Sequence, residues 1–191
     1  MGNEKYLSAL NKVHTLSVGL KAYLDTILKT EIYEKNRKIS LSKNTFNYYS
    51  FIMKGAAKLI AFDPISERET CLTFFFENDF IGHLNYIKGE FLENLQLEFL
   101  EETHLQTIAE KHIVNIFKLF PESNYLDFKI SAFQLGRLLD QLYIRNYYLA
   151  KEKYKMVLKL QPEIGTKIQI KDIATFLGVD NKTLSRIRAK K

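Results

Sequence analysis

The chain has 191 residues, 46% of them hydrophobic, which is enough for a hydrophobic core in one large domain or in a medium and a small one. It contains no apolar run of about 18 residues and no signal-peptide pattern at its start, so we expect a soluble cytoplasmic protein with no membrane partner. A single cysteine, Cys71, excludes an internal disulfide, a four-thiolate zinc site and an iron–sulfur cluster held by one chain.

The positive charge is concentrated at the C-terminal end of the sequence. The formal net charge is +6, and residues 150–191 carry eleven Lys and Arg against four Asp and Glu. Residues 1–149 carry seventeen against eighteen. A short basic module on a near-neutral body is typical of a domain that binds a polyanion, most often nucleic acid. The alternative is a lysine-rich surface that serves only solubility.

Short helices and then short strands are expected before residue 121. Apolar residues at helical spacing predict two helices within residues 6–29, which meet near Ser17. Runs of aromatic and β-branched residues, separated by turn signals, then predict the strands of an antiparallel β-roll. The predicted strands are 48–53, 57–62, 69–76, 95–99 and 105–108, and a helix is expected at 112–120.

Regular alternation in the strand at residues 69–76 places Cys71 on the face that carries Thr73 and Phe75, with Phe74 and Phe76 on the other. Both faces are partly apolar, so we expect this strand to be well buried. No cationic residue adjoins Cys71 in sequence, so we interpret it as a buried apolar residue, with a redox sensor as the alternative.

After Pro121 the pattern predicts a long helix with a heptad seam, in which apolar residues alternate at spacings of four and three. The seam residues are Phe128, Ala132, Leu135, Leu139, Leu142, Asn146 and Leu149. A seam sustained over three heptads favours packing against the same helix of a second copy, and the alternative is packing on the body of its own subunit.

The basic end of the chain has the pattern of a helix-turn-helix. Gly178 stands at the corner, where a positive φ is needed, and Asp180 or Asn181 can cap the second helix. The expected small core consists of Ile173, Ala174, Leu177, Val179, Leu184 and Ile187. The second helix then turns polar residues to its opposite face, where a DNA groove can receive them. The predicted DNA-binding residues are Lys182, Thr183, Ser185, Arg186, Arg188, Lys171 and Lys190.

Taken in order, these parts resemble the Crp/Fnr family of bacterial transcription regulators. The specific matches are Thr-Leu-Ser-Arg-Ile-Arg at 183–188, the strand and turn at 52–55, and Asn-Asp-Phe-Ile-Gly at 78–82. The resemblance implies an α+β chain with a jelly-roll effector domain like those that bind cyclic nucleotides (residues 1–122) and flanking helices. A dimerisation helix (123–150) and a helix-turn-helix domain (151–191) would follow. It also implies a non-enzymatic homodimer on two-fold-symmetric double-stranded DNA, with RNA polymerase as a further candidate partner.

The sequence departs from the members that bind cyclic nucleotides. The resemblance places their ribose-binding Glu at His83 and their phosphate-binding Arg near Glu93, and no Lys or Arg lies between Lys88 and Lys111. A carboxylate would repel the cyclic phosphate, so we expect no control by cyclic AMP. The effector-pocket residues predicted from the resemblance are Phe80, Gly82, His83, Leu84 and Glu93. No cofactor is expected, and an unidentified small-molecule effector stays open.

Two further departures concern DNA. Lys182 stands where well-known members carry Glu. A Glu carboxylate can accept a hydrogen bond from cytosine, whereas a Lys ammonium group can only donate one, so the target half-site should differ. The sequence ends three residues after Arg188, and we expect no β-hairpin wing after the second helix, so Lys167 and Lys171 are candidates for additional phosphate contacts. The four histidines show no close metal-ligand spacing, so no metal site is expected. The alternatives are a small-molecule-binding or metal-dependent β-roll protein, or a sensor that acts through protein partners, in either case without DNA.

Overall fold

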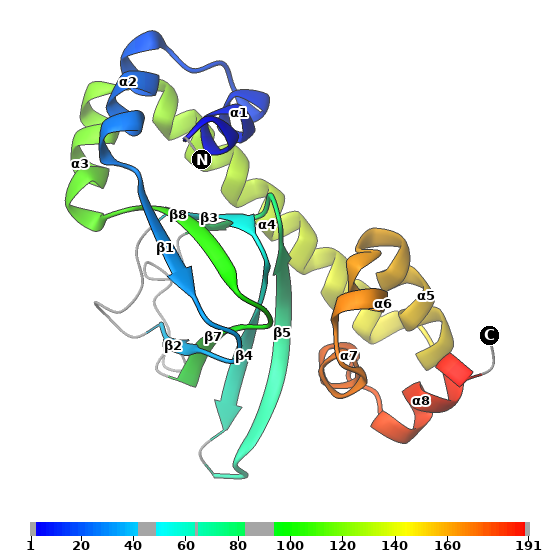
Figure 1. Cartoon of the computed structure of the whole chain (residues 1–191). Coiled ribbons are helices and arrows are strands. Elements are labelled where there is room, and N and C mark those ends of the chain that lie inside the picture. The colour runs from blue at the N-terminus through cyan, green and yellow to red at the C-terminus, as the bar shows by residue number, and fades with distance from the viewer. Residues whose placement is uncertain (1–2, 42–48, 64, 83–93, 190–191) are drawn as a thin grey trace.

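The structure is a computed structural model that describes residues 3–41, 49–63, 65–82 and 94–189. Figure 1 shows a β-roll with three helices at one end, the long helix α4 beside it, and a body of short helices at the C-terminal end of α4. The elements, in chain order, are α1 (Glu4–Val13), α2 (Val18–Ile27), β1 (Lys29–Tyr33), β2 (Lys38–Ser40), β3 (Tyr49–Lys54), β4 (Ala56–Asp63), β5 (Arg68–Phe76), β6 (Phe80–Gly82), β7 (Leu95–Phe99), β8 (Thr103–Ile108), α3 (Glu110–Leu119), α4 (Glu122–Tyr147), α5 (Ala150–Leu160), α6 (Glu163–Lys167), α7 (Ile170–Leu177) and α8 (Asn181–Ala189).

Two four-stranded antiparallel sheets form the roll, in the orders β1-β8-β3-β6 and β2-β7-β4-β5. A buried cluster that includes Ile52, Leu97 and Leu105 draws side chains from both sheets, which is how two sheets exclude water from their inner faces. The strands predicted at 48–53, 57–62, 69–76, 95–99 and 105–108 are confirmed within one or two residues at their ends.

The helices α1, α2 and α3 close one end of the roll. Tyr6 of α1, Leu20 of α2 and Ile113 of α3 join one apolar cluster with Phe51 of β3. The predicted break between the first two helices is confirmed, because the Ser17 hydroxyl accepts a hydrogen bond from the Leu20 N–H (3.1 Å) and caps the start of α2.

The regular alternation predicted for residues 69–76 is wrong at Cys71. The register between β4 and β5 shifts at a bulge, where Leu59 pairs with Thr73 and Ile60 pairs with Cys71. A bulge inserts one residue and moves the following side chains to the other face. Cys71 therefore packs in the cluster of Phe74 and the C-terminal helices, as the prediction of a buried apolar residue requires.

Helix α4 has 26 residues and contacts the rest of the chain along one face, where Leu126, Ile130 and Ile144 are buried. The predicted seam does not continue to Leu149. Tyr148 is extended (φ −108°, ψ 154°), and the Glu152 carboxylate accepts a hydrogen bond from the Leu149 N–H (3.2 Å) at the start of α5. The new helix begins there because a carboxylate in the first turn satisfies a free N–H.

Two glycines should respond in opposite ways to alanine. Gly55 has φ +106°, and a Cβ there would lie 2.5 Å from Thr103 Oγ1 and 2.8 Å from the Glu102 carbonyl oxygen, so Gly55→Ala should lower the free energy of unfolding by about 1–3 kcal/mol. Gly136 lies inside α4 with open space around its Cα, so Gly136→Ala should raise the free energy of unfolding by about 0.5–1 kcal/mol. Urea denaturation measures both, and a Gly55→Ala variant as stable as the parent would contradict the assigned strain.

Candidate nucleic-acid interface

The segment predicted to contact DNA consists of α7, a short turn and α8. Gly178 ends α7 in the left-handed conformation (φ +63°), as its place at the corner requires. Asp180, rather than Asn181, caps α8, because its Oδ1 accepts hydrogen bonds from the N–H groups of Lys182 (2.9 Å) and Thr183 (3.1 Å). The two helices therefore meet at a fixed corner.

An apolar cluster holds this pair of helices on α4, α5 and α6. Ile173, Ala174, Leu177 and Leu184 are buried, and Val179 and Ile187 are partly buried against them. Ile144 of α4, Tyr154 of α5 and Ile164 of α6 complete the cluster. The predicted small core is therefore present, and α8 packs on it through Leu184.

The opposite face of α8 is open. Lys182, Ser185 and Arg186 are exposed, and no ion pair involves either cation within the part of the chain that the structure describes. Their spacing of three and four residues places them along one stripe of the helix. The stripe can donate hydrogen bonds to an acidic or carbonyl-rich surface.

The other predicted DNA-binding residues surround this stripe. Lys171 is exposed on α7, and Thr183 is half-buried on α8. Arg188 is also half-buried, and its Nη2 lies 3.5 Å from the Gly165 carbonyl oxygen. Lys190 lies outside the described residues. Lys167, which the sequence offered for phosphate contact, pairs instead with Glu101 of the roll (2.9 Å).

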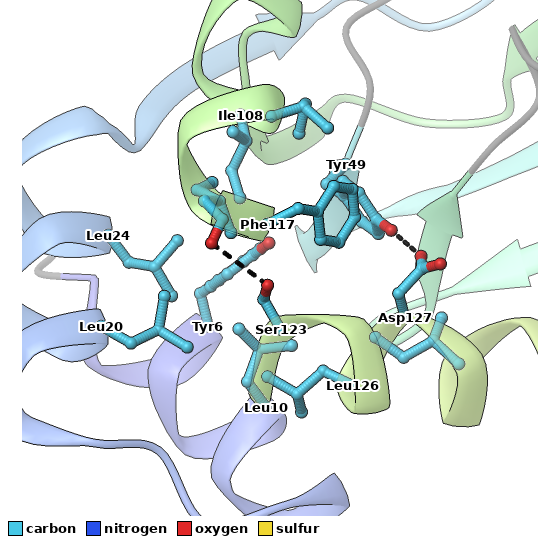
Figure 2. Close-up of a pocket in the computed structure, with 13 residues that line it drawn as sticks. Tyr6, Leu10, Leu20, Leu24, Tyr49, Ile108, Phe117, Ser123, Leu126 and Asp127 are labelled. Carbon is cyan, nitrogen blue, oxygen red and sulfur yellow. Dashed lines mark hydrogen bonds between the residues drawn. The ribbon is translucent and has the colours of Figure 1, made fainter. Parts of the chain in front are cut away.

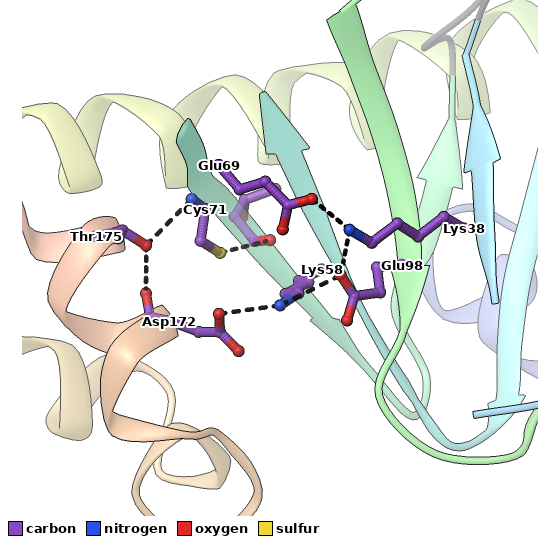
Figure 3. A network of polar contacts seen from close by, with 8 residues as sticks. Lys38, Lys58, Glu69, Cys71, Glu98, Asp172 and Thr175 are labelled. Atoms are coloured by element: carbon purple, nitrogen blue, oxygen red, sulfur yellow. Dashed lines mark hydrogen bonds and ion pairs between the residues drawn. The ribbon is translucent and has the colours of Figure 1, made fainter. Parts of the chain in front are cut away.

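A buried ion pair joins α7 to the roll. Lys58 of β4 reaches Asp172 of α7 (Nζ–Oδ1 2.9 Å), and both side chains are nearly inaccessible to solvent (4% and 13% exposed). Figure 3 shows Lys58 between Asp172 and Glu98, which lies 3.4 Å away and also contacts Lys38. Burial by itself lowers the pKa of Lys58, but the hydrogen bond and charge of Asp172, with Glu98, outweigh it and raise the pKa, so the lysine stays charged at neutral pH.

A second contact of the same junction involves Cys71 and Thr175. The Thr175 hydroxyl accepts a hydrogen bond from the Cys71 N–H of β5 (3.2 Å) and donates one to the Asp172 carbonyl oxygen (3.0 Å), as Figure 3 shows. Burial, with the nearby Asp172 charge, raises the pKa of the Cys71 thiol. Burial of the thiol and its raised pKa both favour the protonated form, which argues against the redox-sensor alternative.

Sequence reasoning did not find this junction. Lys58 was a lone charge in an apolar strand, and Asp172 an ordinary acidic residue in the first turn of a helix. The available signal was the position of Lys58 within an apolar strand, because a buried lysine needs a partner of opposite charge. The sequence does not show that this partner lies on a distant helix.

Most of the seam face of α4 is open to solvent, although Leu135 also lines a cavity between α4 and the roll. Phe128, Leu135, Leu139 and Leu142 are 48–64% exposed, and Asn146 is exposed with its amide bonded to the Leu142 carbonyl oxygen (2.8 Å). Ala132 is exposed as well. The described residues therefore leave most of this face uncovered, which argues against the alternative in which the seam packs on its own subunit.

A cavity of about 310 Å³ lies between the roll and α4. Gly82 lines it, whereas Phe80 lines a different groove, and His83, Leu84 and Glu93 fall outside the described residues. The sequence missed the polar residues that reach this cavity, which are Thr73, Ser131, Gln134, Arg137 and Gln141. Four of them, from Ser131 to Gln141, recur at spacings of three and four on the roll-facing side of α4, which was the available signal.

Four of these polar side chains, all but Ser131, have hydrogen-bond partners within the roll or α4. Gln141 donates to the Thr73 hydroxyl (3.0 Å), and Gln134 donates to the Phe80 carbonyl oxygen (2.9 Å). Arg137 contacts Asp79 (3.0 Å) and the Phe74 carbonyl oxygen (3.0 Å). An anionic ligand would have to compete with Asp79 for the guanidinium.

A second cavity, shown in Figure 2, measures about 40 Å³ and lies among α1–α4, β3 and β8. Leucine and isoleucine side chains line most of it, the Tyr49 hydroxyl is bonded to Asp127, and Ser123 Oγ donates to the Ile116 carbonyl oxygen (3.3 Å). Ligand cavities commonly measure about 300–1,000 Å³, so this space is a packing gap rather than an effector site.

The arrangement of roll, long helix and C-terminal helices recurs in known structures. A transcriptional regulator assigned to the Crp/Fnr family from Eubacterium rectale is 20% identical and has a TM-score of 0.65, with 90% of this chain and 82% of that chain covered. A cyclic nucleotide-binding domain containing protein from Listeria monocytogenes is 16% identical, with a TM-score of 0.68 and coverage of 98% and 90%. The chain has the fold of Crp/Fnr-type regulators.

The regulator CLP from Xanthomonas campestris, which responds to c-di-GMP, is 15% identical, with a TM-score of 0.64 and coverage of 91% of each chain. No protein-family model and no curated sequence matches the chain. Among the described residues, no helix has the length and apolarity to cross a membrane, and no three His, Cys, Asp or Glu side chains are grouped to hold a metal ion.

Removing the buried lysine should weaken the junction. Lys58→Met leaves Asp172 buried without a cation, so the free energy of unfolding should fall by roughly 3–5 kcal/mol, and Lys58→Met with Asp172→Leu should recover much of it. The exposed Lys54, on β3 of the other sheet, is the matched control, and Lys54→Met should change stability by less than about 0.5 kcal/mol. Urea denaturation of the four proteins tests this, and equal losses from Lys58→Met and Lys54→Met would contradict it.

Proposed function

We propose that this chain is a homodimeric, sequence-specific DNA-binding transcription regulator of the Crp/Fnr type. The observation that carries the proposal is the stripe of Lys182, Ser185 and Arg186, exposed on a helix whose other face is fixed by a buried core. The basic balance of residues 150–191 gives that helix an electrostatic attraction for DNA. The shared fold with known regulators supports the same assignment.

In the proposed complex α8 enters the major groove. Arg186 donates two hydrogen bonds to a guanine, Ser185 reaches a base edge or a phosphate, and Lys182 reaches a guanine or a phosphate. Lys171 and Lys190 contact the backbone, which positions the helix without reading sequence. Arg188 contacts a phosphate from its place beside Gly165, where its guanidinium is partly exposed.

Dimerisation through α4 would give the protein its two-fold symmetry. The exposed seam offers a leucine-rich stripe to the same stripe of a second copy, and Asn146 can fix the register. Two copies of α8 then face successive major grooves of a palindromic site, about one helical turn apart.

The proposed regulator does not depend on cyclic AMP. The only cation that lines the 310 Å³ cavity among the described residues is Arg137, and it is held by Asp79. We place an unidentified effector, uncharged and small, in this cavity, where hydroxyl and amide groups could bind it. That CLP responds to c-di-GMP supports the idea that this fold accepts effectors other than cyclic AMP.

Replacing Arg186 should change base preference. Arg186→Ala should cost about 1–3 kcal/mol on the preferred DNA site and relax selectivity at one base pair, because the bidentate contact is lost. Arg68→Ala removes an equal charge from the exposed end of β5 and is the control. Competition binding against single-base variants of the site measures both, and unchanged selectivity in Arg186→Ala would refute the assigned role.

Charge on the seam should separate the subunits. Leu139→Glu buries a carboxylate in the proposed interface and should yield monomers with greatly weakened operator binding. Phe133→Glu is the matched control, because Phe133 is as exposed as Leu139 (64% and 56%) and lies on the other side of α4. Light scattering gives the mass of each variant. A dimeric Leu139→Glu protein would contradict the seam.

A further inference from the structure

A groove of about 680 Å³ lies between α1, α4 and the turn that joins β5 to β6. Figure 1 shows α1 lying against the first half of α4. Ala9 and Val13 form part of the α1 wall, Ile130 and Phe133 form part of the α4 wall, and Phe80 lies between them. The groove is distinct from the candidate DNA interface, and it shares Gln134 and Arg137 with the cavity between the roll and α4.

Positive charge lines this groove. Lys5 and Lys12 reach it from α1, and Lys129 and Arg137 reach it from α4, whereas Asp79 is the one carboxylate among its described lining residues. A cleft lined by one sign of charge raises the local concentration of ions of the opposite sign. The groove is therefore suited to an anion.

The four cations are not equally available. Arg137 is held by Asp79 (3.0 Å), and Lys5 pairs with Glu77 (2.6 Å). Lys12 and Lys129 make no ion pair with any residue that the structure describes, and Lys129 Nζ lies 5.2 Å from the centre of the Tyr125 ring. One available ammonium group thus stands on each wall of the groove.

An apolar surface accompanies these charges. Phe133 is 64% exposed, and Phe80 and Val13 are half-buried. Phe133 precedes Leu135 of the seam by two residues, which places it about 200° around the helix, so a partner on the seam does not cover it. Large apolar side chains left open beside a polar rim mark a binding surface.

We propose that this groove binds a small anionic amphiphile, a molecule with an apolar body and one carboxylate. The apolar body lies against Phe80 and Phe133, and the carboxylate lies between Lys12 and Lys129. The volume of the groove agrees with the roughly 300–1,000 Å³ of small-molecule sites. A protein partner would instead have to bury about 800 Å² of its own surface, so the groove favours a small molecule. This inference does not depend on DNA binding.

The test uses decanoate as the probe and the purified full chain without DNA. Isothermal titration should show decanoate binding at one per chain, and decylamine, with the same body and the opposite charge, should not bind. The affinity for decanoate should fall at least roughly tenfold in Lys12→Glu with Lys129→Glu, because both ammonium groups become repulsive. Lys21→Glu alters an exposed lysine of α2 outside the groove and should bind as the parent does.

Circular dichroism verifies that the variants are folded, and Lys12→Gln with Lys129→Gln repeats the test without charge reversal. The proposal is overturned if decanoate does not bind the parent, if decylamine binds equally well, or if the paired variants bind like the Lys21→Glu protein. In the last case the anion lies in another cavity, such as that between the roll and α4.

Discussion

The arrangement of the whole chain depends on helix α4, which buries one face against the rest of the chain and leaves the opposite face open. One face is buried against the roll and the C-terminal helices through Leu126, Ile130 and Ile144, and the opposite face leaves a line of leucines open to solvent. A helix of 26 residues spans about 39 Å, so it connects the roll at one end with α8 at the other. Because apolar stripes of this length are unfavourable in water, a second copy on the open face would stabilise the helix and fix the distance between two α8 helices.

The ion pair of Lys58 and Asp172 adds a second connection between roll and C-terminal helices. Without it, α5 to α8 would be joined to the roll through α4, the Cys71–Thr175 hydrogen bond, the exposed Lys167–Glu101 ion pair and apolar contacts. A buried charge pair has strict geometry, since each ion loses its hydration and must find its partner. The position of α7 is therefore set by the roll as well as by α4, and the orientation of α8 follows through Gly178 and Leu184.

Local sequence patterns predicted the elements well because each rests on nearby residues. The strands β3, β4, β5, β7 and β8 and the turn at Gly178 were predicted from periodicity and from glycine chemistry, whereas the short strands β1, β2 and β6 were not predicted. The wrong prediction of the face on which Cys71 lies has a different origin. The bulge depends on the pairing of β4 with β5, and the alternation of residues along β5 alone does not reveal it. Leu149 fits the heptad, yet capping by Glu152 starts a new helix there. The Lys58 junction and the groove could not be predicted, because they join residues far apart in the chain.

The most direct test of the central claim is the selection of DNA sites by the purified full chain from a random double-stranded library, with and without cyclic AMP at one fixed salt concentration. The account predicts one palindromic site, with half-sites about one helical turn apart, recovered equally under both conditions. Recovery only with cyclic AMP would contradict the expectation drawn from His83 and Glu93. Recovery of no site under either condition would contradict the proposed DNA-binding function.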